Sequence, residues 1–287
     1  YMSILNELRN TNYLIRHHHP PHDPGTPILR TNDLTVRFDG TVALDEISFE
    51  LQKAEHLAVV GPNGAGKSTL FKVIAGILKP SQGQVHVFGS EPDGHICIAY
   101  VPQRSQVDWT FPVNVADTIM MGRIGKMGLF RQPRARDWEV VHQSLEVVNM
   151  SHLAKRQISQ LSGGQQQRMF IARALAQEAE LMLMDEPLAG LDVASQEDIF
   201  IILDTLQQRS VTALVAMHDL KLAAERFDRV MLLNHRILGL GAPDDVFSTE
   251  KLASAYGGHL HLVPSDDGVM VVSDTCCEGD EEEHHHD

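Results

Sequence analysis

The stretch Gly61–Thr69, which reads GPNGAGKST, organises this chain. It has the pattern of a glycine, four free positions and then Gly-Lys-Ser/Thr, and it lies between the apolar run Leu57–Val60 and the helix-like segment Leu70–Ile74. Glycines let several backbone N–H groups converge on one anion, and the following helix adds its positive N-terminal end. A glycine-rich turn that binds nothing is the alternative, but the strand before it and the helix after it count against that alternative. The stretch therefore predicts a site for the phosphates of a nucleotide.

Two side chains of this loop have separate expected roles. Lys67 is expected to reach the outer phosphates and to act in catalysis, and Ser68 is expected to offer its hydroxyl to Mg²⁺. We expect the nucleotide to be contacted by all nine positions of the loop: Gly61, Pro62, Asn63, Gly64, Ala65, Gly66, Lys67, Ser68 and Thr69.

The composition limits the class of protein. The chain has 287 residues, of which 43% are hydrophobic, as in an ordinary soluble globular protein. Apolar runs such as Ile199–Leu203 are far shorter than the roughly 20 residues of a membrane-spanning helix, and the three cysteines form no disulfide framework. We therefore expect a cytosolic chain without a signal peptide. The net charge of −14 disfavours a nucleic-acid partner, and nine acidic residues lie in Asp266–Asp287, which has no Lys or Arg.

Strand-like and helix-like segments alternate along the chain, which favours a largely parallel sheet covered by helices. We expect an irregular extension at 1–26, a folded domain at 27–265 with a helical subdomain inserted at about 104–172, and a disordered acidic tail at 266–287. The expected strands are 34–38, 42–51, 57–60, 85–88, 96–101, 181–184, 212–217 and 230–233; the expected helices are 115–121, 137–149, 151–154, 196–208 and 220–227, with one more from the phosphate loop to about Gly76 and one beginning after Gly164.

A pair of carboxylates follows one of these strands. The apolar residues 181–184 precede Asp185 and Glu186, so the carboxylates lie at the carboxyl end of a strand, where open α/β sheets bind ligands. Asp185 is expected to hold Mg²⁺, and Glu186 to orient the attacking water as a general base. Adjacent carboxylates are common on solvated turns, but the apolar strand and the phosphate loop favour the catalytic interpretation.

A second anion-binding pattern occurs at 161–165, which reads LSGGQ. A serine followed by two glycines at a helix start offers a hydroxyl, N–H groups and the helix dipole. One nucleotide does not need two such cradles from one chain. We therefore expect a head-to-tail pair of subunits, in which each clamps the ATP held by the other through Ser162, Gly163, Gly164 and Gln165.

With these motifs, the sequence resembles the nucleotide-binding subunits of ATP-binding-cassette (ABC) transporters over about residues 28–262. The motifs are GPNGAGKST, Gln103, LSGGQ, LMLMDE, the AGLD turn that ends at Asp192, and His218. The resemblance implies a P-loop NTPase with a RecA-like sheet lobe and an inserted α-helical subdomain. It also implies an ATPase that forms a homodimer around two ATP molecules and drives an integral membrane permease from the cytoplasmic face of the membrane.

The resemblance assigns further roles, for which the residues alone leave alternatives. Gln103 would sense Mg²⁺ or the lytic water, although alone it would be a solvated loop amide. Asp192 would bridge the two subunits, although it could simply cap the following helix. His218 follows a strand and would contact the γ-phosphate. Phe38 lies where the family has an aromatic ring stacked on adenine, and its alternation with Leu34 makes a core role an equal alternative.

The segment after Gln103 bears on the transported substrate. The sequence of this segment looks like that of the manganese/zinc/iron importer branch of the family, with manganese favoured. This resemblance implies an extracytoplasmic metal-binding protein as an indirect partner. Gly241–Gly257 also looks like the ATPases of iron–siderophore and cobalamin importers. Trp109 and Phe111 would either dock the permease or fill the core of the subdomain.

The two ends of the chain are rich in metal-ligating residue types. His17, His18, His19 and His22 lie at one end and CCEGDEEEHHHD, Cys276 to Asp287, at the other. The C-terminal segment could sense metal, but a solvated disordered tail is the stronger interpretation. A soluble cassette protein acting on ribosomes or DNA is a further alternative, disfavoured by the single set of motifs and the absence of heptads.

Overall fold

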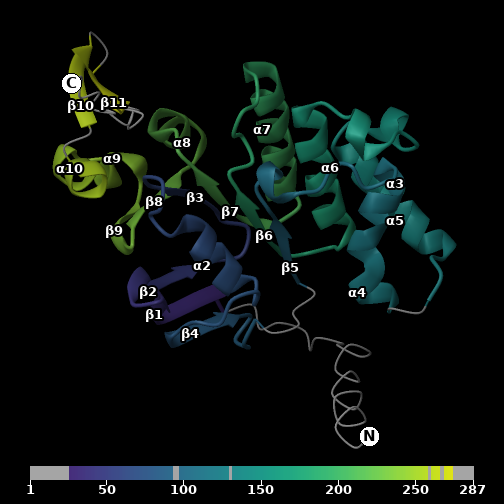
Figure 1. Cartoon of the computed structure of the whole chain (residues 1–287), viewed down its shortest axis with the longest axis horizontal. Helices are drawn as coiled ribbons and strands as arrows, with labels where there is room; N and C mark the ends of the chain where they lie inside the picture. Colours follow the sequence, from purple (N-terminus) through teal and green to yellow (C-terminus); the bar gives the residue numbers. More distant parts are fainter. Residues whose placement is uncertain (1–25, 93–96, 129–130, 258–259, 266–267, 274–287) are drawn as a thin grey trace, which may run out of the picture.

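A computed structural model describes residues 26–92, 97–128, 131–257, 260–265 and 268–273 (Figure 1). Its centre is a six-stranded sheet in which the neighbouring strands β5, β6, β7, β3 and β8 are parallel and β9 is antiparallel to β8. The fold is therefore α/β with a parallel sheet, as predicted. In sheet order the strands are β5 (Ile98–Val101), β6 (Leu181–Asp185), β7 (Thr212–Met217), β3 (His56–Val60), β8 (Arg229–Asn234) and β9 (Arg236–Gly241).

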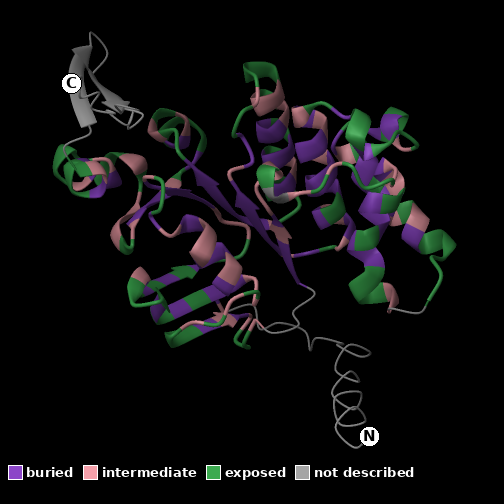
Figure 2. Ribbon diagram, in the orientation of Figure 1, coloured by how far each residue is buried: buried purple, intermediate pink, exposed green. Residues whose placement is uncertain are grey.

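One face of this sheet is covered by a helix and a second sheet. The helix is α2 (Lys67–Ile74), and the second sheet is antiparallel, in the order β2 (Thr41–Leu51), β1 (Leu29–Phe38) and β4 (Gln82–Val87). Side chains alternate across a strand, so Leu57 and Val59 of β3 face this side and pack in its apolar core with Phe71 and Leu44. Figure 2 shows the central strands buried along their length.

The other face of the central sheet packs against helices. The chain leaves the sheet at β5, forms a group of helices that lies to one side in Figure 1, and returns at β6. This group is the inserted helical lobe of the predicted fold class. Its α-helices are α3 (Val115–Met120), α4 (Ile124–Met127), α5 (Ala135–Val147) and α6 (Gly163–Ala176); the chain continues with α7 (Val193–Gln208), α8 (Leu220–Arg226), α9 (Pro243–Val246) and α10 (Thr249–Tyr256).

Several elements differ from the sequence prediction. The segment expected as a helix at 151–154 is a short 3-10 helix, Ser151–Leu153, and β1 begins at Leu29 rather than Leu34. Strand β9 and helices α9 and α10 were not predicted. Residues 268–273, expected in a disordered tail, form β11 (Gly268–Ser273), which pairs with β10 (Leu260–Ser265). The reason is the apolar run Val269–Val272, whose β-branched residues favour a strand.

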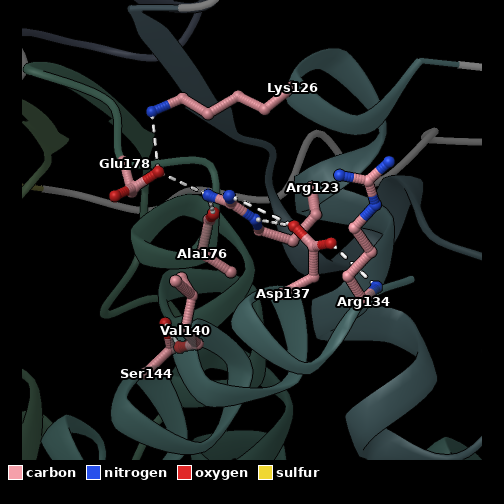
Figure 3. A network of polar contacts seen from close by, with 8 residues as sticks. All are labelled: Arg123, Lys126, Arg134, Asp137, Val140, Ser144, Ala176 and Glu178. Atoms are coloured by element: carbon pink, nitrogen blue, oxygen red, sulfur yellow. Dashed lines mark hydrogen bonds and ion pairs between the residues drawn. The ribbon is translucent and has the colours of Figure 1, made fainter.

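Within the helical lobe, a polar network around the buried Arg123 joins α5 to the end of α6 (Figure 3). The guanidinium of Arg123, which is 4% exposed, donates to Asp137 of α5 at 3.3 Å and to the carbonyl oxygen of Ala176 at 2.9 Å. It also pairs at 2.5 Å with Glu178, which in turn pairs with Lys126 at 2.8 Å. The network fixes α5 against the carboxyl end of α6, the helix that leads into β6.

Candidate nucleotide site

The phosphate loop follows β3. At two of its positions there is no room for a side chain, so the loop requires glycine there. A Cβ atom on Gly61 would lie 2.0 Å from the carbonyl oxygen of Leu233, and one on Gly66 would lie 2.6 Å from that of Ala43. Gly66 also has a φ of +97°, in the left-handed region that favours glycine. The loop thus packs its backbone directly on neighbouring strands and turns into α2, whose first residue is Lys67.

The ammonium group of Lys67 is enclosed by acceptors. It donates to the carbonyl oxygens of Gly61 at 2.6 Å and Pro62 at 3.0 Å, and it lies 3.4 Å from Nδ1 of His218. Burial lowers the pKa of Lys67, and the negative charges of Glu186 and Asp185 act in the opposite direction. An ammonium group has three hydrogens; two of them have carbonyl acceptors here, and the third has Nδ1 of His218, which accepts in the tautomer that carries its proton on Nε2. A phosphate oxygen that binds Lys67 must therefore replace one of these contacts.

Glu186 lies at the centre of the site, directly after β6. Its backbone has a φ of +51°, and its N–H donates to the carbonyl oxygen of Ala216 at 3.2 Å. One carboxylate oxygen accepts from Nε2 of Gln103 at 2.9 Å, and the other contacts Nε2 of His218. The hydrogen bond with His218 is the main cause that lowers the pKa of Glu186. The carboxyl group is therefore ionised at neutral pH, as a general base must be.

Asp185 is 1% exposed, and its two carboxylate oxygens have different surroundings. Oδ2 accepts a hydrogen bond of 3.1 Å from the hydroxyl of Tyr100, whereas Oδ1 is buried and has no hydrogen-bond partner in the part of the chain that the structure describes. A buried oxygen without a partner is costly, and a carboxylate oxygen is a ligand that suits Mg²⁺ or its bound water. The residues therefore fit a magnesium ion. Ser68, expected as a second ligand, lies half-buried in the first turn of α2.

Tyr100 was not predicted as a site residue. It lies opposite Leu183 in the register of β5 and β6, two positions before Asp185 and on the same face of the sheet. Burial is the main cause that raises the pKa of the Tyr100 hydroxyl, and Asp185 raises it further. The signal in the sequence is an aromatic hydroxyl near the end of a strand, and it becomes informative only when the neighbouring strand is known.

The LSGGQ residues lie at the start of α6, and in the described part of the chain no hydrogen bond or ion pair joins them to the Lys67 cluster. Ser162 is the N-cap: its hydroxyl accepts from the N–H of Gln165 at 3.3 Å, and the Gln165 side chain accepts from the N–H of Ser162 at 3.0 Å. Gly163 and Gly164 occupy the first turn, where N–H groups have no partner within a helix. A Cβ on Gly164 would lie 2.5 Å from Oγ of Ser195, so this turn packs tightly on α7.

The remaining predicted residues fall in different surroundings. Asp192 caps α7, where its carboxylate accepts from the N–H of Ser195 at 2.8 Å. Phe38 is 46% exposed at the end of β1, so a core role for its ring is wrong. Gln103 is bonded to Glu186 and is not a solvated loop amide. In the phosphate loop, Asn63 and Gly64 are exposed, Ala65 is buried, and Pro62 and Thr69 are half-buried.

Trp109 and Phe111, the two aromatic residues expected either to dock the permease or to fill the core of the subdomain, differ in burial. Trp109 packs edge-on against Phe170 at 5.4 Å between ring centroids, and its Nε1–H donates to the carbonyl oxygen of Arg104 at 3.2 Å. Phe111 is 56% exposed. Trp109 therefore belongs to the core of the lobe, and Phe111 is available for a partner.

A cleft of about 570 Å³ lies beside Glu186, between the helical lobe and the turn after β6. Gln103, Arg104, Gln167 and Leu191 contribute to its lining. The histidine-rich and cysteine-containing ends, at 17–22 and 276–287, lie outside the described residues. Within the ranges that are described, no group of three His, Cys, Asp or Glu side chains is placed to hold a metal ion, and no helix is long and apolar enough to cross a membrane.

A phosphate loop after β3 and a carboxylate after β6, which is separated from β3 by β7 in the sheet, define a P-loop ATPase. A family model described as "ABC transporter" matches residues 44–189. The chain belongs to this family. As in its relatives, it is a nucleotide-binding ATPase subunit that works with a membrane permease.

The chain is 43% identical to the manganese transport system ATP-binding protein MntB of Bacillus subtilis, over 80% of this chain and 92% of that protein. It is 44% identical to the zinc transport system ATP-binding protein TroB of Treponema pallidum, over 81% and 88%. Among solved structures, it is similar to a metal-chelate type ABC transporter in an inward-facing conformation. There the TM-score is 0.73 and the identity 30%, over 86% of this chain and 96% of that one.

Proposed function

We propose that the chain hydrolyses ATP to energise the uptake of a divalent metal ion, manganese first and then zinc or iron, through a separate membrane permease. The cluster of Lys67, His218, Glu186 and Gln103 is the observation that carries the ATPase assignment. The relatives at 43% and 44% identity, named for manganese and zinc transport, support the choice of substrate. An iron–siderophore or cobalamin importer is the second candidate, favoured by the likeness to the metal-chelate type transporter.

The chemistry proceeds by positioning and charge neutralisation. The phosphates lie in the loop Gly61–Thr69, where Lys67 leaves one of its present acceptors for a γ-phosphate oxygen. Magnesium, held through Ser68, Asp185 and Gln103, would neutralise charge on the phosphates. Glu186 accepts the proton of the attacking water, and the hydrogen bonds from Gln103 and His218 fix the direction in which its oxygens point. His218 then contacts the γ-phosphate.

A second copy of the chain completes each ATP site. The first turn of α6, with Ser162, Gly163, Gly164 and Gln165, is separate from the Lys67 cluster within one chain, so it serves the site of the partner. Asp192 caps α7 beside this turn and meets the other subunit across the dimer interface. Phe38, with its exposed ring, stacks on adenine.

The assembly works at the cytoplasmic face of the membrane. The subunits attach there through the permease, and Phe111 of the helical lobe belongs to the docking surface. An extracytoplasmic protein delivers the metal to the permease, and no nucleic acid takes part. Uptake measurements with cells that contain the permease and this chain, in which manganese, zinc and ferric siderophore compete, distinguish the two candidate substrates.

The shared site is tested by mixing two differently tagged variants of the chain. Protomers with Lys67→Ala are combined with protomers with Ser162→Arg, and the purified mixed dimer should recover ATPase activity, since one of its two sites is intact. The control dimer pairs the double variant with wild type and carries the same substitutions, but neither of its sites is intact. If each chain formed a complete site alone, the control dimer would be active and the mixed dimer inactive.

A further inference from the structure

The register of the central sheet brings a tyrosine to the carboxylate at the end of β6. Strands β5 and β6 are parallel, and Tyr100 lies opposite Leu183. Leu183 and Asp185 are two positions apart, so they lie on the same face as Tyr100. From there the phenol extends along the sheet towards the site, and its hydroxyl donates to Oδ2 of Asp185 at 3.1 Å.

This hydrogen bond makes the two oxygens of Asp185 inequivalent. The side chain is almost fully buried, and in the described part of the chain Tyr100 is its sole hydrogen-bond donor. Lys67 is the nearby cation, but its ammonium group contacts Gly61, Pro62 and His218 instead. The terminal torsion of an aspartate is broad and roughly two-fold, so a carboxylate held at neither oxygen turns easily. Tyr100 restrains that rotation.

The direction of the hydrogen bond between Tyr100 and Asp185 decides which oxygen of Asp185 remains without a partner. A tyrosine hydroxyl can donate or accept a hydrogen bond, whereas an ionised carboxylate accepts only. Beside Asp185 the Tyr100 hydroxyl must therefore be the donor, which occupies Oδ2 and leaves Oδ1 buried without a partner among the residues described. Oδ1 is then the oxygen that remains for an ion or for a water molecule bound to it.

We propose that Tyr100 is a positioning residue for the magnesium site, which holds Oδ2 of Asp185 so that Oδ1 faces the ion. The inference rests on the proposed Mg²⁺–ATP site, and it adds to that site a residue of β5 that does not touch the nucleotide. Groups that orient a metal ligand in this way typically change metal affinity about 10- to 100-fold when they are removed.

The test measures how strongly magnesium tightens ATP binding. All proteins carry Glu186→Gln so that ATP is not consumed, and the ATP dissociation constant is measured by calorimetry in excess Mg²⁺ and again in excess chelator. The ratio of the two constants reports on magnesium alone. With Tyr100→Phe, which removes only the hydroxyl, we expect the magnesium-dependent ratio to fall about 10-fold and the constant in chelator to stay the same.

The chain offers a matched control in Tyr256 of α10. Its hydroxyl is also buried, but it has no hydrogen-bond partner among the described residues, so Tyr256→Phe removes the same atom away from the site. This variant should leave the magnesium-dependent ratio unchanged. Melting temperatures of both variants show whether either substitution acts through the fold.

Asp185→Asn separates the inference from the function on which it rests. If Asp185→Asn abolishes the magnesium effect and Tyr100→Phe does not change it, Tyr100 has no positioning role and the inference is wrong. An equal loss of ATP affinity with and without magnesium in Tyr100→Phe would also overturn it, because that result describes a structural role. If Asp185→Asn itself leaves the magnesium effect intact, the proposed magnesium site is wrong and the inference falls with it.

Discussion

Nε2 of Gln103 donates a hydrogen bond of 2.9 Å to Oε2 of Glu186. Gln103 begins the segment that enters the helical lobe, and Glu186 follows β6, so the bond joins the lobe that carries the exposed Phe111 to the proposed base. A permease that moves the helical lobe would thereby change the orientation of the Glu186 carboxylate. Under the proposed function, this contact would be a physical path between transport and hydrolysis.

Loss of the hydrogen bond between Gln103 and Glu186 should slow hydrolysis. Gln103→Ala should lower the ATPase kcat about 10-fold, because Glu186 loses a hydrogen bond that fixes one of its oxygens. The ATP affinity in excess chelator should stay the same, since Gln103 contacts the carboxylate rather than the phosphate loop. Gln160→Ala, an exposed amide elsewhere in the helical lobe, is the matched control. An unchanged kcat in Gln103→Ala would show that the contact has no catalytic role.

Lys67→Ala should weaken ATP binding about 10- to 100-fold, because it removes the buried cation of the phosphate loop. A titration with a fluorescent ATP analogue measures the effect. Lys72→Ala removes the same side chain from the last turn of the same helix and should bind ATP as wild type does. Equal affinities for the two variants would contradict the role given to Lys67.

Phe38→Ala should weaken ATP binding about 10-fold through the loss of stacking on adenine. Tripolyphosphate, which has the phosphates but no base, should bind the variant and wild type equally. The comparison isolates the ring from any change in the phosphate loop. Equal losses for both ligands would mean that Phe38 acts on the fold of the site and does not stack on adenine.

The lowered pKa of Glu186 predicts a pH dependence of stability. Because the folded-state pKa is below the unfolded value, the stabilising contribution is present above the unfolded pKa and is lost as the pH falls through the folded pKa. The difference in melting temperature between wild type and Glu186→Gln should therefore shrink as the pH falls from about 6 to about 4 and below. A difference that is constant or grows towards low pH would contradict the assigned direction.

The network of Figure 3 predicts a large cost for losing its buried cation. Arg123→Met should destabilise the protein by about 3 kcal/mol, because Asp137 and the Ala176 carbonyl lose their donor while buried. Arg30→Met breaks a half-exposed pair with Glu50 and should cost about 1 kcal/mol or less. Urea unfolding of both variants gives the comparison. Equal losses of unfolding free energy in the two variants would show that the burial of Arg123 does not increase its contribution to stability.

Local signals in the sequence were sufficient for the central fold and for the motifs of the site. The loop Gly61–Thr69 and the run before Asp185 each combine a local pattern with a strand, so they predicted the edge of the sheet where Lys67 and Glu186 both contact His218. These local patterns could not predict which residues of neighbouring strands lie opposite each other. Tyr100 becomes part of the site only through the register of β5 with β6, and the left-handed backbone of Glu186 has no signature in its side chain.

The end of the domain was hard to predict for a different reason. Strand β9 reads RILGLG, and its two glycines weaken the strand pattern, so pairing with β8 determines its structure. The sequence could not decide whether Trp109 and Phe111 pack in the core or face a partner. Aromatic residues close together on an irregular segment can point into the core or towards solvent. One ring packs on Phe170 and the other is exposed.

The role of Glu186 as general base is tested most directly by the rate of phosphate release from ATP by wild type and by Glu186→Gln, with ATP binding measured on the same samples. We expect Glu186→Gln to bind ATP as tightly as wild type, to form an ATP-bound dimer in light scattering, and to release phosphate about 10²- to 10⁴-fold more slowly. Phosphate release by Glu186→Gln at the wild-type rate would contradict this role, because the base would then lie elsewhere.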